Sequence, residues 1–180
     1  MEVIETKIKD LLIIKPKVFT DPRGYFFESY NADSFKQHGI MASFVQDNQS
    51  LSSAGVLRGL HFQAPPFDQG KLVRVITGAV LDVAVDIRKK SPSYGQHISI
   101  ELTEENKTMF FIPPGFAHGF LTLRDNTIFS YKCTNVYNKA SEGCVLWNDS
   151  DLNINWNISN PILSEKDLTG TVFKDFNSPF

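Results

Sequence analysis

The 180-residue sequence contains only two cysteines, Cys133 and Cys144, and no apolar run near the ~20 residues that a membrane-spanning helix needs. Two cysteines do not make a disulfide scaffold, and Cys133 lies in an alternating apolar run, which predicts a buried free thiol. A cross-strand disulfide would require an oxidising compartment, for which nothing in the sequence argues. Residues 1–9 alternate between charged and apolar side chains, so they lack the apolar stretch of a signal peptide. We therefore expect a cytoplasmic protein.

The sequence also lacks a dominant charge of either sign. Its 18 basic and 20 acidic residues give a formal net charge of −2 and a pI near 6.1. This balance gives no electrostatic reason to expect a nucleic-acid partner. A hydrophobic content of 42% and a charged content of 21% are typical of a soluble globular protein, and the length suits one sizeable core. We expect a single domain over residues 1–180, with neither a nucleic-acid nor a membrane partner.

Long helical patterns are missing as well. Asn31–His38, with Gly39 placed to end it, is the best candidate for a short helix, and a second one is expected from Ser164. Elsewhere, short strand-like runs alternate with turn residues such as Asp21–Gly24, which predicts an all-β sandwich or barrel. The expected strands are Leu11–Phe19, Tyr25–Tyr30, Ser43–Gln46, Val56–Gln63, Leu72–Thr77, Ala79–Ile87, His97–Leu102, Lys107–Ile112, Phe116–Leu123, Ile128–Cys133 and Cys144–Trp147.

Two histidines within expected strands are candidates for chemistry. His61 shares a strand face with Gln63, because side chains alternate along a strand. A lone strand histidine is more often structural than functional. His118 follows a Pro-Pro-Gly turn, at a position where a barrel mouth would hold a ligand. Arg58 has the opposite parity to His61, so both side chains reach one cavity only if Gly59 permits a bulge or the strand begins late.

The two histidines resemble the paired histidine motifs of the cupin superfamily. In metal-binding cupins the first motif carries His-x-His and then a carboxylate, whereas here Gln63 replaces the second histidine. Gln69 or Lys71 falls where the carboxylate would stand. Because a divalent metal generally needs at least three good protein ligands, we expect no metal and no cofactor. A histidine in a metal-free cavity becomes a candidate general base.

A series of motifs resembles the dTDP-4-dehydrorhamnose 3,5-epimerase family and runs from about Lys17 to Asp167. The matching segments are, in order, 21–28, 44–48, 57–63, 69–75, 82–88, 112–120, 131–134, 147–149 and 164–167. Phe62, where tyrosine is common in the family, keeps the apolar character. The resemblance implies a cupin-type jelly-roll barrel with a few short helices and a homodimer. It also implies inversion of C3 and C5 of dTDP-4-keto-6-deoxy-D-glucose through an enolate.

The resemblance assigns the catalytic roles to three residues. His61 matches the family's base, Asp167 the carboxylate that orients it, and Tyr131 the proton donor on the opposite side of the sugar. From the sequence alone, Asp167 would be interpreted as a capping-box partner of Ser164, and both roles are compatible. Alternation places Tyr131 on an inward face with Phe129, where an ordinary core tyrosine is the simpler interpretation.

The resemblance also assigns residues that hold the substrate. Lys71 matches the lysine that stabilises the enolate oxygen, and His118 would add a second donor there. Basic side chains suit the diphosphate because they form charge-assisted hydrogen bonds. The remaining matches to substrate-binding positions are Arg23, Phe26, Glu28, Gln46, Asp47, Asn48, Arg58, Tyr137, Glu142 and Lys166.

Several alternatives remain open at this point. An epimerase that inverts only one centre, or acts on a related nucleotide-linked 4-keto-deoxysugar, would share most of these residues. A cupin ketoisomerase fits less well, because the motifs around Lys71 and Asp167 favour the epimerases. A sugar-binding barrel without activity would not need an opposed acid and base. A metal-dependent cupin oxygenase would be revealed by metal analysis.

Overall fold

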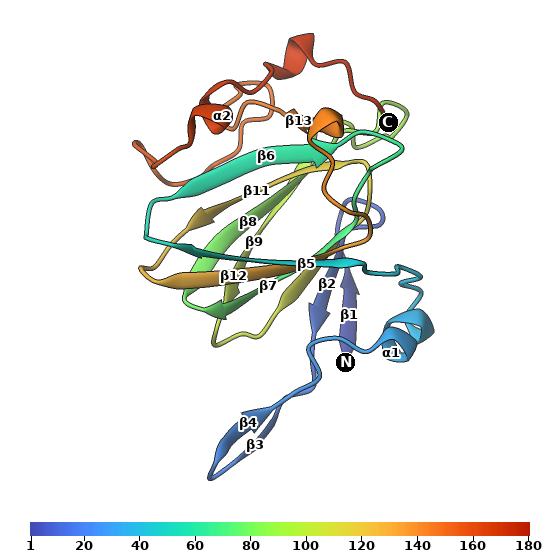
Figure 1. Cartoon of the computed structure of the whole chain (residues 1–180), viewed down its shortest axis with the longest axis vertical. Helices are drawn as coiled ribbons and strands as arrows, with labels where there is room; N and C mark the ends of the chain where they lie inside the picture. The colour runs from blue at the N-terminus through green and yellow to red at the C-terminus, as the bar shows by residue number, and fades with distance from the viewer.

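The computed structural model describes residues 1–180, and nearly all of its regular structure lies in two antiparallel sheets that face each other (Figure 1). The six-stranded sheet has the order β1 (Glu2–Glu5), β2 (Leu12–Lys15), β10 (Met109–Ile112), β7 (Lys71–Thr77), β12 (Thr127–Cys133) and β5 (Gln46–Ser52). The five-stranded sheet has the order β13 (Glu142–Cys144), β6 (Leu57–Gln63), β11 (Phe116–Thr122), β8 (Ala79–Asp86) and β9 (His97–Thr103). The predicted all-β jelly roll is confirmed.

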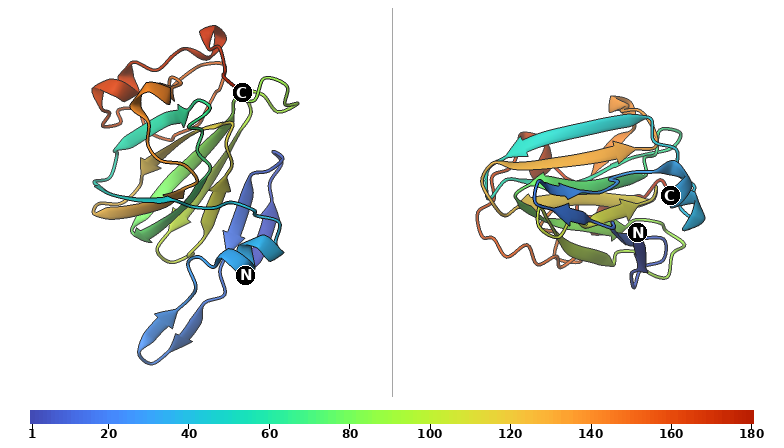
Figure 2. Two further views of the ribbon diagram at one scale, coloured as in Figure 1. Left: turned by 45° about the vertical axis from the view of Figure 1, so that its right-hand side comes forward. Right: turned by 90° about the horizontal axis from the view of Figure 1, so that it is seen from below.

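The remaining elements are short. Strands β3 (Phe19–Asp21) and β4 (Gly24–Phe26) form a separate hairpin that projects from one end of the barrel (Figures 1 and 2). The two α-helices are α1 (Ala32–Gln37) and α2 (Glu165–Leu168), and single 3₁₀ turns cover Lys139–Ser141 and Phe173–Asp175. None of these helices has both the length and the apolar character needed to span a membrane.

Strand alternation divides the apolar residues among three clusters. Inward residues such as Val73, Phe110 and Phe129 fill the space between the sheets. On the outer face of the five-stranded sheet, Leu60 packs in a cluster with Trp156 from the C-terminal segment. On the outer face of the six-stranded sheet, a third cluster includes residues of α1. Because apolar side chains also pack against parts of both outer faces, the polar residues that point inward stand out as functional candidates.

Both short helices begin as expected. The side chain of Asn31 accepts hydrogen bonds from the backbone N–H groups of Asp33 and Ser34, which caps α1. Ser164 caps α2 and forms a capping box with Asp167. The predicted turn at residues 21–24 also joins two strands, although β4 ends at Phe26 and does not continue to Tyr30.

Three further strand predictions were wrong in extent, for related reasons. The strand expected at Ser43–Gln46 is β5 at Gln46–Ser52, a largely polar segment that is a strand because it pairs along its whole length with β12. The strand expected at Cys144–Trp147 is β13 at Glu142–Cys144, because β6 fixes the pairing there. The long run predicted at 11–19 yields only β2, whose partner β1 was not predicted. Hydrogen-bonded pairing over long sequence distances decided these boundaries, and apolar content did not.

Candidate active site

One polar cavity of about 290 Å³ opens between the two sheets. Residues from both sheets and from α2 line it, and most of them carry ionisable or hydrogen-bonding groups. The lining residues are Gln49, Ser50, Arg58, His61, Lys71, His118, Gly119, Phe120, Phe129, Tyr131, Ser164, Lys166 and Asp167. The cavity therefore contains the three residues expected to be catalytic, together with Arg58, Lys71, His118 and Lys166 from the expected substrate-binding set.

Gly59 brings Arg58 and His61 to the same cavity. In the pairing of β6 with β11, His61 lies opposite His118 and Arg58 lies opposite Phe120, so β6 has one extra residue between the two pairs. This is the bulge that lets Arg58 and His61, which are three residues apart, point to the same face. Gly59 has φ +130°, and a Cβ there would lie 2.5 Å from the Gly119 Cα, so only glycine fits. The extra residue in β6 restores the inward direction for Arg58.

His61 and Asp167 form a close pair. His61 Nε2 lies 2.8 Å from Asp167 Oδ1, and Asp167 is 2% exposed. The separation is that of a hydrogen bond, but the ring N–H is poorly aligned with the carboxylate oxygen. Hydrogen bonds of catalytic groups are commonly misaligned before substrate binds. With Nε2 facing the carboxylate, Nδ1 is the ring nitrogen left to accept a proton from a ligand.

The surroundings of Asp167 keep it ionised. Burial acts to raise the pKa of this carboxyl group, but the hydrogen bonds that it accepts outweigh burial and hold the pKa well below its usual range. The donors include the Gly59 N–H at 3.0 Å and the Ser164 hydroxyl at 2.6 Å. Asp167 thus serves in the capping box and contacts His61 at the same time.

His118 has a partner that the sequence analysis did not select. Its Nε2 lies 2.9 and 3.0 Å from the two carboxylate oxygens of Asp82, which is fully buried. Burial lowers the pKa of His118, and Asp82 opposes this effect only in part. A neutral ring that donates its Nε2–H to Asp82 offers a lone pair at Nδ1, so it accepts a hydrogen bond from a hydroxyl better than it stabilises an oxyanion. The sequence did contain a signal for this contact, because Asp82 is a charged residue within the otherwise apolar strand at 79–86. A buried charge needs a partner, so Asp82 could have been identified as a partner of a polar residue in the cavity.

Lys71 and Tyr131 come from the sheet opposite His61. Lys71 begins β7, and its Nζ lies 5.9 Å from the ring centroid of Tyr131. Burial lowers the pKa of Lys71, so its ammonium group is poorly solvated and would gain from a nearby oxyanion. Burial raises the pKa of Tyr131, which keeps the phenol protonated and able to donate. A cation and an acid therefore face the histidine base across the cavity.

At the rim, a hydrogen-bonded cluster joins several expected substrate-binding residues. Glu142 contacts the ammonium group of Lys166 and accepts a hydrogen bond of 3.0 Å from the Tyr137 hydroxyl. The side chain of Gln46 accepts from the Tyr137 backbone N–H at 2.9 Å. Tyr137 is 55% exposed, so its ring is free to contact a ligand.

The segment Gln46–Asn48 divides between the two faces of its sheet. Gln46 contacts Asn48, whose amide also reaches the Cys133 thiol. Asp47 points outward and forms an ion pair of 2.9 Å with Lys132. Successive side chains of a strand point to opposite faces, so Asp47 points away from the face that Gln46 and Asn48 share. Asp47 is therefore not part of the cavity within one chain.

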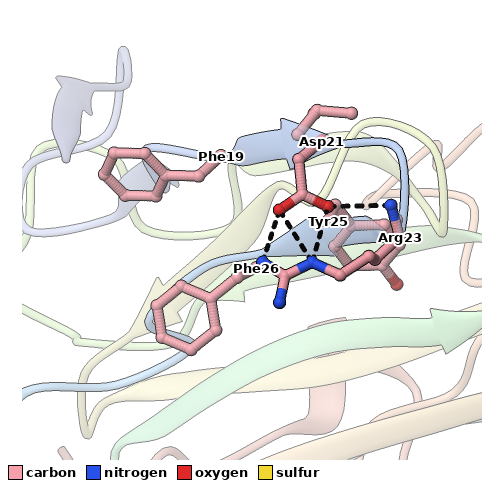
Figure 3. A pocket seen from close by; sticks show the side chains of 7 residues that line it. Phe19, Asp21, Arg23, Tyr25 and Phe26 are labelled. Atoms are coloured by element: carbon pink, nitrogen blue, oxygen red, sulfur yellow. Dashed lines mark hydrogen bonds and ion pairs between the residues drawn. The ribbon is translucent and has the colours of Figure 1, made fainter.

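Three further expected substrate-binding residues lie on or next to the projecting hairpin, away from the cavity. Arg23 and Phe26 are on the projecting hairpin, where the Arg23 guanidinium contacts Asp21 and where exposed Phe19, Tyr25 and Phe26 line the same shallow pocket (Figure 3). Glu28 follows the hairpin and accepts a hydrogen bond from the Asn31 amide. Within a single chain, none of the three lines the cavity that holds His61.

Cys144 is a further neighbour of the base that sequence reasoning missed. It lies directly opposite His61 in the pairing of β13 with β6. Burial, reinforced by the charge of Asp167, raises the pKa of Cys144 to about 11. No local pattern in the sequence indicates this contact, because the pairing of β13 with β6 joins segments far apart in the chain.

The cupin metal positions do not converge on a ligand set. The Gln63 amide is committed to the loop backbone, where it donates to Phe67 and Val136 and accepts from Asn138. His118 Nε2 is taken by Asp82. The expectation of a metal-free active site was made from the residue types at these positions and stays a prediction.

A base, an acid and a cation gathered in one cavity of a jelly-roll barrel define a class, that of cupin-type enzymes that move protons. Comparisons with known proteins specify the family. The family model for dTDP-4-dehydrorhamnose 3,5-epimerase matches residues 5–175. The chain belongs to this family.

Individual relatives agree with the family model. An enzyme named dTDP-4-dehydrorhamnose 3,5-epimerase from Shigella flexneri is 52% identical over 176 residues, which is 97% of each chain. A 3,5-epimerase from Legionella pneumophila, solved in complex with dTDP-4-keto-L-rhamnose, is 46% identical with a TM-score of 0.94, over 98% of this chain and 94% of that one. A 3′-monoepimerase from Streptomyces bikiniensis, solved with dTDP-quinovose, is 31% identical with a TM-score of 0.89, over 94% of this chain and 86% of that one. The fold is thus shared by double and single epimerases.

Proposed function

We propose that this chain inverts C3 and C5 of dTDP-4-keto-6-deoxy-D-glucose and so forms dTDP-4-keto-L-rhamnose. The observation that carries the proposal is the His61–Asp167 pair facing Tyr131 across one cavity that also contains the buried Lys71. Relatives at about half identity over nearly the whole chain carry this activity in their names.

The mechanism uses the ketone of the substrate as its activating group. A ketone acidifies the hydrogens on both neighbouring carbons, because the electron pair left by the proton is delocalised onto oxygen as an enolate. His61 Nδ1 takes the proton, the C–H electron pair moves into the enolate, and the Lys71 ammonium group stabilises the oxyanion. Since Tyr131 lies on β12 and His61 on β6, base and acid approach the sugar from facing sheets. Donation of the Tyr131 proton to the opposite face of the carbon completes the inversion.

The nucleotide end of the substrate would lie toward the rim. Arg58 and Lys166 supply positive charge at the cavity wall, which suits a diphosphate. The exposed ring of Tyr137 is available to pack against the base or sugar. Gln46 and Glu142 hold Tyr137 and Lys166 in place.

The projecting hairpin supports a homodimer. Phe19, Tyr25 and Phe26 are all more than half exposed, which is unfavourable for a two-stranded hairpin that buries so little of its aromatic surface. Arg23 and Phe26 match substrate-binding positions but lie outside the cavity of their own chain. A second copy that receives the hairpin would cover the aromatic rings and complete the substrate site. The chain then acts as one epimerase domain over residues 1–180, in the cytoplasm, where both free thiols stay reduced.

Proton exchange in D₂O tests the reaction directly. The substrate is made in situ, and NMR follows deuterium at C3 and C5 with the wild type and with His61→Ala. Label at both carbons with the wild type and at neither with the variant is the expected result. Label at one carbon would identify a single-centre epimerase, the alternative for which the Streptomyces bikiniensis relative is a precedent. No label at either carbon would exclude this substrate.

Subunit mixing tests the hairpin. Arg23→Ala and His61→Ala chains are unfolded together and refolded at equal amounts, so that about half of the dimers contain one chain of each kind. If Arg23 acts in the partner's cavity, each mixed dimer has one intact site, and about a quarter of the wild-type activity returns. If Arg23 acts in its own chain, mixing restores nothing.

A further inference from the structure

Three side chains with metal-binding atoms converge beside the active-site base. A ring nitrogen of His61, the Cys144 sulfur and a carboxylate oxygen of Asp167 all lie within 4.8 Å of one another. His61 and Cys144 are directly opposite each other on paired strands, so they share one face of the sheet. Asp167 reaches them from α2 and is held by its hydrogen bonds from Gly59 and Ser164. The backbone therefore fixes all three positions.

The histidine nitrogen in this group is an unusual buried atom. His61 Nε2 is inaccessible to solvent and has no well-aligned hydrogen-bond partner, although Asp167 Oδ1 is only 2.8 Å away. Its one polar neighbour is the Asp167 carboxylate, and a bound cation would take the place of the ring N–H in that contact. A cation between the nitrogen and the carboxylate would satisfy both groups.

The chemistry of the three atoms selects the kind of cation. Imidazole, thiolate and carboxylate are together the ligands that Zn²⁺ takes in proteins, whereas Mg²⁺ and Ca²⁺ prefer oxygen alone. Tetrahedral bonds of about 2.0–2.3 Å place the ligand atoms roughly 3.3–3.6 Å apart. From the present arrangement, the His61 Nε2–Asp167 Oδ1 separation of 2.8 Å would have to widen, and the Cys144 sulfur, within 4.8 Å of both atoms, would move by rotation of its side chain.

We propose that Zn²⁺, or a related thiophilic divalent cation, binds reversibly to His61, Cys144 and Asp167 and thereby inhibits the enzyme. The cation replaces the proton of the Cys144 thiol, which passes to solvent. It also occupies His61 Nε2, so the ring proton moves to Nδ1 and the base can no longer accept one from substrate. Lys71 and Lys166 line the same cavity, and their charge opposes a cation, which favours reversible binding over a permanent metal.

Cobalt binding tests the site without reference to activity. The full-length protein is freed of metal with a chelator and titrated with Co²⁺, whose thiolate complexes give an intense near-ultraviolet absorption band. The wild type should bind one Co²⁺ per chain with this band, and Zn²⁺ should displace it. Cys144→Ser should abolish the band, whereas Cys133→Ser, which removes the other thiol, should retain it.

Inhibition is the second readout and rests on the proposed epimerase activity. Zn²⁺ should inhibit the wild type and Cys133→Ser alike, and a chelator should restore activity. Cys144→Ser should keep its basal rate and require at least about tenfold more Zn²⁺ for the same inhibition, since it lacks one ligand. A wild type without a thiolate band, or equal Zn²⁺ sensitivity in Cys144→Ser and wild type, would overturn the proposal. Failure of the epimerase assay alone would leave the cobalt result intact, so the two proposals fail separately.

Discussion

The change Asp167→Asn separates the two roles that the structure gives to this carboxylate. Asparagine keeps the shape and can still accept a hydrogen bond within the capping box, but it has no charge. Its amide nitrogen can turn toward His61 and donate to Nε2, which would leave the proton of the ring on Nδ1. His61 would then present an N–H, and no lone pair, to the carbon acid. The substitution thus removes the base through its tautomer while the fold is largely kept.

The expected loss of activity follows from the contacts. A hydrogen bond to a charged group contributes about 1.5–3 kcal/mol, and the wrong tautomer adds to that loss. A related orienting aspartate in the serine proteases costs about 10⁴-fold in kcat when it is replaced by asparagine. We expect kcat to fall roughly 10²–10⁴-fold, equivalent to about 3–5 kcal/mol of transition-state stabilisation, with little change in KM.

Ser164→Ala is the matched control, because it removes the cap of α2 and leaves the carboxylate charge next to His61. Loss of a cap should cost about 0.5–2 kcal/mol of unfolding free energy and reduce kcat much less than Asp167→Asn does. Urea unfolding and the initial rate of deuterium incorporation are measured for both variants. Equal kcat for the two variants, with equal losses of stability, would refute the orienting role and leave Asp167 as a capping residue.

Three further predictions address other residues. Tyr131→Phe should keep the fold and still allow deuterium exchange at the carbon that His61 deprotonates. The rate of inversion, measured by product analysis, should fall at least about 10²-fold. An unchanged rate of inversion would exclude the phenol as the proton donor. Lys71→Met should lower kcat by roughly 10²–10³-fold without reducing resistance to urea, because burial already disfavours the ammonium group; a destabilised variant would argue for a structural lysine. Burial acts to raise the pKa of Asp86, but hydrogen bonds from Arg88 and two serines lower it overall. Its stabilising effect is therefore complete above the unfolded pKa of about 3.9 and is lost as the pH falls through the lower folded value, so Asp86→Asn should destabilise the protein more at pH 7 than at pH 3 in urea unfolding.

The sequence predicted the inward-facing part of the site well because alternation along a strand is a local property. His61, Tyr131 and Lys71 could be assigned to one face of their strands from a few neighbouring residues. The need for a bulge at Gly59 followed from the same counting, since Arg58 and His61 differ in parity. Asp82 could have been identified as well, because its inward position in an apolar strand requires a partner such as His118.

What the sequence by itself determined is the alternating pattern of short strands, hence the barrel, and the series of motifs that marks the family. The tertiary structure alone decided which distant residues meet. Asp167 is more than a hundred positions from His61, and Cys144 lies opposite His61 only because β13 pairs with β6. The hairpin that carries Arg23 folds away from the cavity, although its motif matches a substrate-binding position. These outcomes depend on strand register and on how a loop packs, and both arise from contacts between segments far apart in the chain, which no local pattern encodes.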